Sequence, residues 1–215
     1  MLIIPAINCK DYETALSRVK LADKFLNSKY RWMHLDVVDG VFAPTTTWGS
    51  PEELKKICSQ FPDIKFEIHL MVENPASVAE DWLKSGAKRL IVHVESHGDP
   101  EKVRVITHQY GAEAMLSGGP GVSAQKHYEA GKHFSFLQVL SVSPGFAGQE
   151  FSQEAEQKIS FLRSKLPNVK IEIDGGVNDE TIGIAKTAGA DVAISASFIF
   201  GADNPQEAYE TLRTV

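Results

Sequence analysis

The feature that most constrains this sequence is a regular alternation of short β-rich runs with segments of helical character. Several of the runs are apolar almost throughout, as strands covered on both faces of a parallel sheet are. The predicted strands are Leu2–Ile7, Trp32–Val38, Lys65–Met71, Arg89–Val94, Ala112–Ser117, Phe134–Val142, Val169–Asp174 and Asp191–Ser197. The pattern indicates parallel strands joined by helices.

Helix signals fill the segments between these runs. Residues that favour helix N-caps stand at the expected starts, at Asp11, Ser50, Asp99, Ser123 and Asn178. A Gly-Ala pair between a helix end and a strand recurs at Gly86, Gly111 and Gly189, which indicates a repeated unit. The predicted helices are Tyr12–Leu26, Pro51–Phe61, Ala76–Ser85, Pro100–Tyr110, Ala124–Ala130, Glu154–Leu166, Glu180–Ala188 and Pro205–Leu212.

Eight strands in strict alternation with eight helices favour one fold class, the closed (β/α)8 TIM barrel. An open doubly wound sheet usually has fewer strands. No Gly-, Pro- or Ser-rich linker divides the chain, so we expect residues 1–215 to form a single domain. The 215 residues allow about 27 per unit, against roughly 250 residues for a typical barrel, so the loops must be short.

Composition and charge exclude several classes of protein. Hydrophobic residues make up 43% of the chain, which is too many for a disordered protein. A net charge of −6 argues against a nucleic-acid partner, which would require a basic face. The apolar start, Met1–Ala6, is too short for a signal peptide or a membrane span, and Cys9 and Cys58 make no disulfide framework. We therefore expect a soluble, cytoplasmic protein with no membrane partner.

Polar residues stand at the ends of three predicted strands, where the functional side chains of such barrels lie. His34 and Asp36 end the second strand and share a face, because strand residues two apart point the same way. His69 ends the third strand, and Asp174 ends the seventh. Taken singly, each is more often structural, but in a barrel all four would converge at the mouth. Two imidazoles and two carboxylates suit Zn²⁺, Fe²⁺, Mn²⁺ or Co²⁺.

Glycine-rich loops follow the last three predicted strands. The loop residues are Gly145, Phe146, Ala147 and Gly148, then Gly175 and Gly176, then Ala196 and Ser197. A single glycine more often marks a tight turn, but such loops on adjacent final strands suit a phosphate group held by backbone N–H groups. With a net charge of −6, these local amides would have to supply the attraction.

The remaining histidines carry weaker signals. His93 shares a strand face with Glu95, and the pair fits support behind a metal site as well as it fits ordinary core polar residues. The others fall on predicted loops or helices and are expected at the surface, namely His97, His108, His127 and His133. No lysine stands convincingly at a strand end, which disfavours a Schiff-base aldolase.

The segments that carry these residues resemble the ribulose-phosphate 3-epimerase family. They run in the family's order over nearly the whole chain, at residues 34–44, 69–75, 92–95, 142–149, 172–176 and 199–202. The resemblance implies a ribulose-phosphate-binding barrel in which His34, Asp36, His69 and Asp174 hold a divalent metal. It further implies that Asp36 and Asp174 are the catalytic acid–base pair, that Met71 lines an apolar floor, and that the protein forms a homo-oligomer.

The implied reaction is inversion of C3 in a small phosphorylated ketose, between D-ribulose 5-phosphate and D-xylulose 5-phosphate. Inversion requires a proton to leave one face and another to return on the opposite face, which two opposed carboxylates can do. A cation on the C2 and C3 oxygens would stabilise the enediolate. Two alternatives remain open: an epimerase of a hexulose phosphate such as allulose 6-phosphate, and a phosphosugar-binding homologue with weak or no turnover.

The chain departs from the family pattern at several positions around the expected site. The departures are Ala6 for serine, Val38 and Leu140 for methionines, Ala196 for glycine, and residues 118–123 for an Asn-Pro-x-Thr loop. None removes an expected metal ligand or acid–base residue. They therefore bear on substrate and efficiency more than on the type of reaction.

Overall fold

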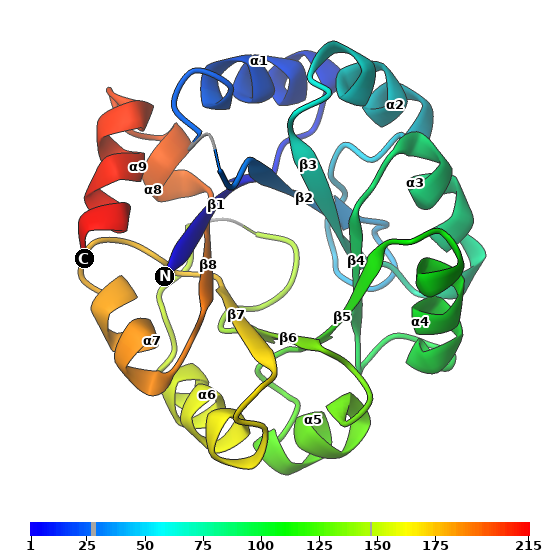
Figure 1. Ribbon diagram of the computed structural model, residues 1–215, viewed down its shortest axis with the longest axis vertical. Coiled ribbons are helices and arrows are strands. Elements are labelled where there is room, and N and C mark those ends of the chain that lie inside the picture. The colour runs from blue at the N-terminus through cyan, green and yellow to red at the C-terminus, as the bar shows by residue number, and fades with distance from the viewer. Residues whose placement is uncertain (27–28, 147) are drawn as a thin grey trace.

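The computed structural model describes residues 1–26, 29–146 and 148–215. Parallel strands close into a barrel in the order β1 to β8, and helices surround it (Figure 1). The strands are β1 (Leu2–Ile7), β2 (Trp32–Val38), β3 (Lys65–Met71), β4 (Arg89–His93), β5 (Glu113–Gly118), β6 (Phe136–Leu140), β7 (Lys170–Asp174) and β8 (Val192–Ser195). Since β1 also pairs with β8, with Pro5 opposite Ser195, the predicted (β/α)8 barrel is confirmed.

Helices follow the strands around the barrel. They are α1 (Tyr12–Ala22), α2 (Pro51–Gln60), α3 (Ala79–Ser85), α4 (Pro100–Gln109), α5 (Ala124–Gly131), α6 (Gln153–Lys165), α7 (Ile182–Ala188), α8 (Ser197–Phe200) and α9 (Pro205–Thr214), with a 3-10 turn at Pro75–Ser77. Predicted caps start four of them, because the side chains of Asp11, Ser50, Asp99 and Ser123 accept first-turn N–H groups. Asn178 instead accepts N–H groups ahead of α7.

The eighth unit differs from the prediction. β8 ends at Ser195, and Ser197, which was expected at the end of the strand, begins the short helix α8. Ile199 of this helix is fully buried, with Phe198 and Phe200 packed against the same core. Short apolar runs of this kind do not distinguish a strand from a buried helix, which is why the pattern misassigned it.

Alternation along the strands separates an apolar outer layer from a barrel interior that contains many buried polar side chains. Leu35 and Ile68 belong to the large core between the sheet and the helices, whereas their neighbours point inward. The buried polar residues that lie at the inward positions are His34, Asp36, Glu67, His69, Arg89, His93, Gln138 and Glu172. Strand runs that look largely apolar in the sequence therefore still place polar side chains inside the barrel, whereas the inner residues of β1 and β8, such as Ile4 and Ile194, are apolar.

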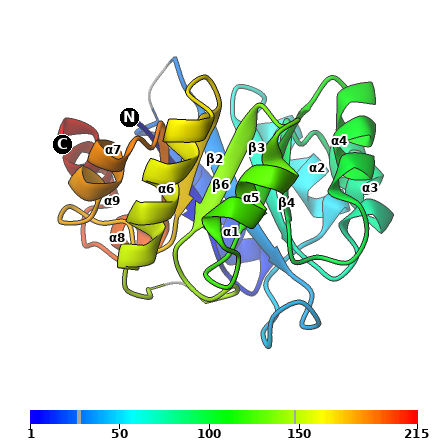
Figure 2. The same ribbon diagram turned by 90° about the horizontal axis from the view of Figure 1, so that it is seen from below.

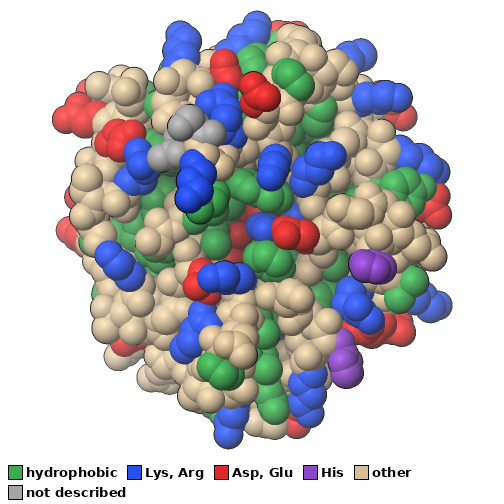
Figure 3. Space-filling model, viewed as in Figure 1, with side chains coloured by type: hydrophobic (Ala, Val, Ile, Leu, Met, Phe, Trp, Pro, Cys, Tyr) green, Lys and Arg blue, Asp and Glu red, His purple; other side chains and the backbone are tan. Residues whose placement is uncertain are grey.

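The two ends of the barrel differ in what they present. The N-terminus lies at one end, and the loop that follows β2 extends from the other (Figure 2). On the face shown in Figure 3, Lys and Arg side chains are interspersed with Asp and Glu rather than gathered in one area. Within the described parts of the chain, no helix is long and apolar enough to cross a membrane.

Candidate metal centre and active site

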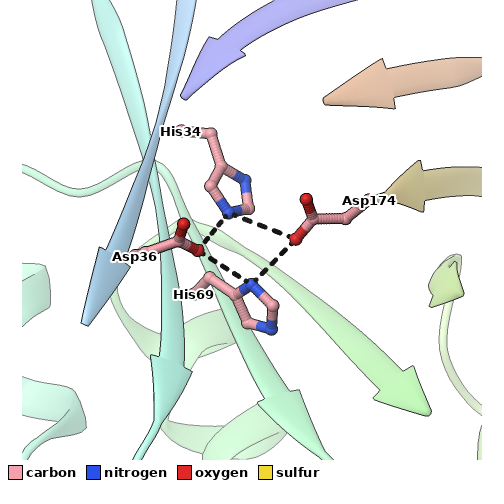
Figure 4. A group of neighbouring side chains, drawn as sticks. All are labelled: His34, Asp36, His69 and Asp174. Atoms are coloured by element: carbon pink, nitrogen blue, oxygen red, sulfur yellow. Dashed lines mark hydrogen bonds and ion pairs between the residues drawn. The ribbon is translucent and has the colours of Figure 1, made fainter. Parts of the chain in front are cut away.

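The four predicted ligand residues come together at the ends of β2, β3 and β7 (Figure 4). Asp36 Oδ1 lies 3.1 Å from His34 Nε2 and 3.3 Å from His69 Nδ1. Asp174 Oδ2 lies 3.8 Å and 3.2 Å from the same two nitrogens. Each residue thus contributes one atom, and the two aspartates face each other across the pair of histidines.

These separations fit a divalent metal ion. Ligand atoms about 2.0–2.2 Å from a tetrahedral ion lie about 3.3 Å from one another, close to the separations seen here. His69 Nδ1 is buried and makes no hydrogen bond with any described residue, although it faces the oxygens of Asp36 and Asp174. A nitrogen lone pair turned toward two carboxylates is repelled unless a positive charge lies between them. A metal ion at this point would supply that charge.

The charges of the cluster compensate one another. Burial disfavours charge on His34, but hydrogen bonds with Asp36 and Glu67 outweigh it and raise the His34 pKa well above its usual range. Burial also opposes ionisation of Asp36, yet its contacts with His34 and His69 lower the Asp36 pKa. The carboxylates of Asp174 and Asp36 likewise overcome burial and raise the pKa of His69. The surrounding carboxylates therefore favour positive charge at this point of the barrel.

The Glu67 carboxylate and the Arg89 guanidinium hold His34 in place on the side of its Nδ1 atom. His34 Nδ1 lies 2.9 Å from Glu67 Oε1, so a proton on Nδ1 leaves the Nε2 lone pair directed at the cluster. Arg89 donates to the other oxygen of Glu67 at 2.5 Å and to Glu113 at 2.6 Å. The sequence prediction missed Glu67 and Arg89. Continuing the two-residue period backwards from His69 and His93 would have found both.

Two further polar residues, also missed, lie below Asp174. Gln138 donates to Glu172 Oε1 at 3.0 Å and contacts Asp174 Oδ2 at 3.4 Å. Burial raises the pKa of Glu172 well above its usual range, and the nearby charge of Glu67 raises it further. Burial therefore favours the neutral form of Glu172, which limits the negative charge in the barrel interior.

A cavity opens above the cluster, between the loops that follow β6, β7 and β8. The predicted substrate-contacting residues that line it are Met71, Gly145, Phe146, Gly148, Gly175, Gly176, Ala196 and Ser197. Ala147, predicted with them, lies outside the described residues. Asn8, which the sequence prediction missed, also lines the cavity and donates to Asp36 Oδ2 at 2.9 Å. It stands two residues beyond Ala6 and so restores a polar group at the end of β1.

Gly176 allows the loop after β7 to pack against the segment that precedes α6. Its φ is +66°, and an added Cβ would lie 2.6 Å from Phe151 Cα. We expect Gly176→Ala to lower the free energy of unfolding by roughly 1–3 kcal/mol, because a non-glycine residue is strained at such a φ. Chemical denaturation measures the loss, with Gly121→Ala as control, where an added Cβ meets no described atom within 4 Å. Equal stability of the two variants would contradict this.

One histidine differs from its prediction. His127, expected at the surface, is fully buried on the inner face of α5, with Nε2 3.1 Å from the Leu116 carbonyl oxygen. Burial lowers its pKa to about 4, so it is a neutral packing residue. The other three, His97, His108 and His133, are exposed as predicted.

The closed ring of parallel strands defines the class of fold, the (β/α)8 barrel. The chain superimposes on 3-hexulose-6-phosphate synthase with a TM-score of 0.75 at 17% identity, covering 100% of this chain and 99% of the other. It matches 3-keto-L-gulonate-6-phosphate decarboxylase from Vibrio cholerae with a TM-score of 0.75 at 14% identity, over 100% and 95% of the two chains. At such identities the likeness establishes the fold alone.

Sequence comparison places the chain more narrowly. Residues 3–200 match the ribulose-phosphate 3 epimerase family. The chain is 35% identical to ribulose-phosphate 3-epimerase of Mycobacterium bovis, over 99% of this chain and 91% of the relative. It is 31% identical to the Candida glabrata protein of the same name, over 96% and 88% of the two. The chain belongs to the ribulose-phosphate 3-epimerase family, as its motifs predicted.

Proposed function

We propose that this protein is a metal-dependent 3-epimerase that interconverts D-ribulose 5-phosphate and D-xylulose 5-phosphate. The observation that carries the proposal is the opposition of Asp36 and Asp174 across two histidines at the base of the cavity. In this proposal His34, Asp36, His69 and Asp174 hold Zn²⁺, Fe²⁺, Mn²⁺ or Co²⁺, and the two aspartates act as acid and base. Membership of the family and the names of the relatives support it.

In this proposal the two aspartates transfer protons at opposite faces of one carbon. Asp36 turns Oδ1 to the histidines, while its Oδ2 accepts the Asn8 amide. Asp174 turns Oδ2 to the histidines, so its Oδ1 remains for a proton. One carboxylate removes the proton on C3 and the other delivers a proton from the opposite side, which inverts the carbon. A divalent cation, when bound, supplies positive charge that stabilises the enediolate.

The rest of the cavity suits the remainder of a small phosphorylated ketose. Met71 and Leu140 provide apolar surface beside the reacting carbon. The loops that contain Gly148, Gly176 and Ser197 would receive the phosphate through backbone N–H groups, the donors that helix starts and glycine turns offer to anions. Backbone donors carry no net charge, which agrees with an acidic chain that binds an anion.

Residues 1–215 form one domain, which the pairing of β1 with β8 from opposite ends of the chain supports. The protein works in the cytoplasm. A relative from Oryza sativa named as the cytoplasmic isoform, 34% identical over 98% of this chain and 92% of its own, supports this. The protein acts on its ketose as a homo-oligomer, as the family resemblance implies.

Measuring the bound metal together with the epimerase activity tests the proposal. We expect the chelated protein to be inactive and to regain activity with one or more of Zn²⁺, Fe²⁺, Mn²⁺ and Co²⁺. Assays on D-ribulose 5-phosphate and allulose 6-phosphate, run side by side, decide between a pentulose and a hexulose substrate. Protein that binds a phosphosugar but stays inactive with every metal would contradict enzymatic function. His108→Asn, at an exposed histidine, is the control that should lose neither metal nor activity.

A further inference from the structure

We propose that Glu95 is a positioning residue which, acting through His93, determines that the Nδ1 atom of His69 faces the cluster with its lone pair. The inference rests on the metal site proposed above, and it concerns the two residues behind the ligands. Neither His93 nor Glu95 contributes an atom to the four-residue cluster. Their contacts nevertheless lead in a single line from the ligand His69 to the backbone of Gly119, just after β5.

The first link is a hydrogen bond between two imidazole rings. His69 Nε2 lies 2.8 Å from His93 Nε2, and both rings are buried. The rings are 5° from parallel with centroids 4.9 Å apart. The two nitrogens are much closer together than the two ring centroids. Both nitrogens therefore lie between the centroids, and the rings meet edge to edge. One nitrogen of this pair must carry the proton and the other must accept it.

The second link decides which nitrogen carries that proton. His93 Nδ1 lies 3.3 Å from Glu95 Oε2, and an ionised carboxylate only accepts hydrogen bonds. A neutral His93 therefore carries its proton on Nδ1 and accepts at Nε2. It follows that His69 donates from Nε2 and keeps a lone pair on Nδ1. That is the atom which faces Asp36 and Asp174 and has no hydrogen-bond partner among the described residues.

The backbone after β5 fixes Glu95 in this orientation. Its second oxygen, Oε1, accepts the Gly119 N–H at 2.9 Å, so both oxygens of the carboxylate are used as acceptors. The carbonyl of Gly119 accepts from Lys158 of α6 at 2.7 Å, and the Lys158 side chain is itself buried. Gly119, which binds Glu95 through its N–H, is thus also held through its carbonyl by α6.

Gly119 also explains one departure from the family pattern. It lies in residues 118–123, which replace the family's Asn-Pro-x-Thr loop. An added Cβ on Gly119 would lie 2.5 Å from Glu95 Oε1. A larger residue would push the carboxylate away from both of its donors. The glycine allows the backbone after β5 to approach Glu95 closely enough to form this hydrogen bond.

Glu95→Gln tests the direction of the chain, because it keeps the size of the side chain and makes one end a donor. If the amide nitrogen faces Gly119, two donors oppose each other. If it faces His93, then His93 must accept at Nδ1 and donate from Nε2, which places a proton on His69 Nδ1. Either arrangement disturbs His69 as a metal ligand, the first by weakening the support of His93 and the second by placing a proton on His69 Nδ1. We therefore expect Zn²⁺ affinity to fall by about 10- to 100-fold, the usual effect of losing a partner behind a histidine ligand.

Two measurements distinguish this role from simple packing. Calorimetric titration gives the Zn²⁺ affinity. The ¹⁵N signals of the His69 ring in metal-free protein at alkaline pH give the tautomer directly, and we expect a mixed or inverted population in Glu95→Gln. His93→Gln can place an amide oxygen where Nε2 accepts and should retain most of the affinity, whereas His93→Leu should lose it. Gly119→Ala should behave like Glu95→Gln.

Glu73→Gln is the matched control, since Glu73 lines the same surface depression as Glu95 but pairs with the exposed His97. It should leave both Zn²⁺ affinity and the His69 signals unchanged. Wild-type affinity together with wild-type His69 signals in Glu95→Gln and His93→Leu would overturn the inference. If wild-type protein bound none of Zn²⁺, Fe²⁺, Mn²⁺ and Co²⁺, the proposed metal site would fall, and the His69 signals would still decide whether Glu95 sets the tautomer.

Discussion

In Asp174→Asn, we expect epimerisation to fall by about 10²- to 10⁴-fold, the usual contribution of a positioned acid or base. An amide in place of the carboxylate can still offer an oxygen toward His69, at the position where Asp174 Oδ2 lies 3.2 Å from Nδ1. It cannot accept or deliver a proton at C3. Asp174 ends β7 and keeps some solvent exposure, so the barrel should fold normally. Steady-state kinetics at matched metal content measure the loss.

Exchange of the C3 proton with solvent deuterium tests the role of Asp174 separately from inversion. With Asp36 intact, one epimer should still exchange its C3 proton with solvent deuterium without inversion, whereas the other epimer should not exchange. Asp36→Asn should reverse which epimer exchanges. The control is Asp179→Asn, at an exposed aspartate five positions further along, which should retain full activity. Inversion at the wild-type rate in Asp174→Asn would refute the role of this residue.

Arg89→Met is expected to cause the second large effect, a loss of stability. Arg89 is 5% exposed, its guanidinium lies 4.5 Å from the Trp32 ring and 4.2 Å from the Phe136 ring, and it neutralises the fully buried Glu67. Methionine fills similar space but leaves the Glu67 carboxylate buried without its partner. Breaking a buried pair in this way costs about 3–5 kcal/mol of unfolding free energy. Denaturant unfolding of the metal-free protein measures it.

Two further variants show whether the unpaired carboxylate is the cause. Adding Glu67→Gln to Arg89→Met removes the unpaired buried charge. The double variant should recover more than half of the unfolding free energy lost in Arg89→Met. Arg104→Met breaks an exposed pair with Glu101, which should cost about 0–1 kcal/mol. If Arg89→Met were no less stable than Arg104→Met, the charge beneath His34 would not be a significant part of the stability of the barrel.

Much of the fold could be predicted because its signals are local. Caps such as Ser50 and Ser123 act within one turn of a helix, and strand runs such as Lys65–Met71 carry their own period. Boundaries were less predictable where packing decides. Ser197 begins a helix because Ile199 is buried against the core, which a short apolar run does not reveal. His127 was misplaced for the same reason, since helix position alone does not say which face is covered.

The candidate site was predictable to a similar depth. His34 and Asp36 share a strand, so their common face follows from the two-residue period, and the barrel topology then brings His69 and Asp174 to the same end. Behind them, the sequence indicated only the pair His93 and Glu95, as one of two open interpretations, and it missed the other partners. Asn8 contacts Asp36 across 28 positions of sequence, and Gln138 contacts Glu172 across 34. No local pattern connects residues so far apart.

By itself, the sequence determined the order of strands and helices, the family, and which side chains end the strands. Those properties depend on neighbours along the chain and on periods of two or three to four residues. Only the tertiary structure decided which atom of each ligand faces the centre, and which residues hold it there. Hydrogen-bond direction depends on distances of about 3 Å between strands, so the line from His69 through His93 and Glu95 to Gly119 exists only when β3, β4 and β5 lie side by side.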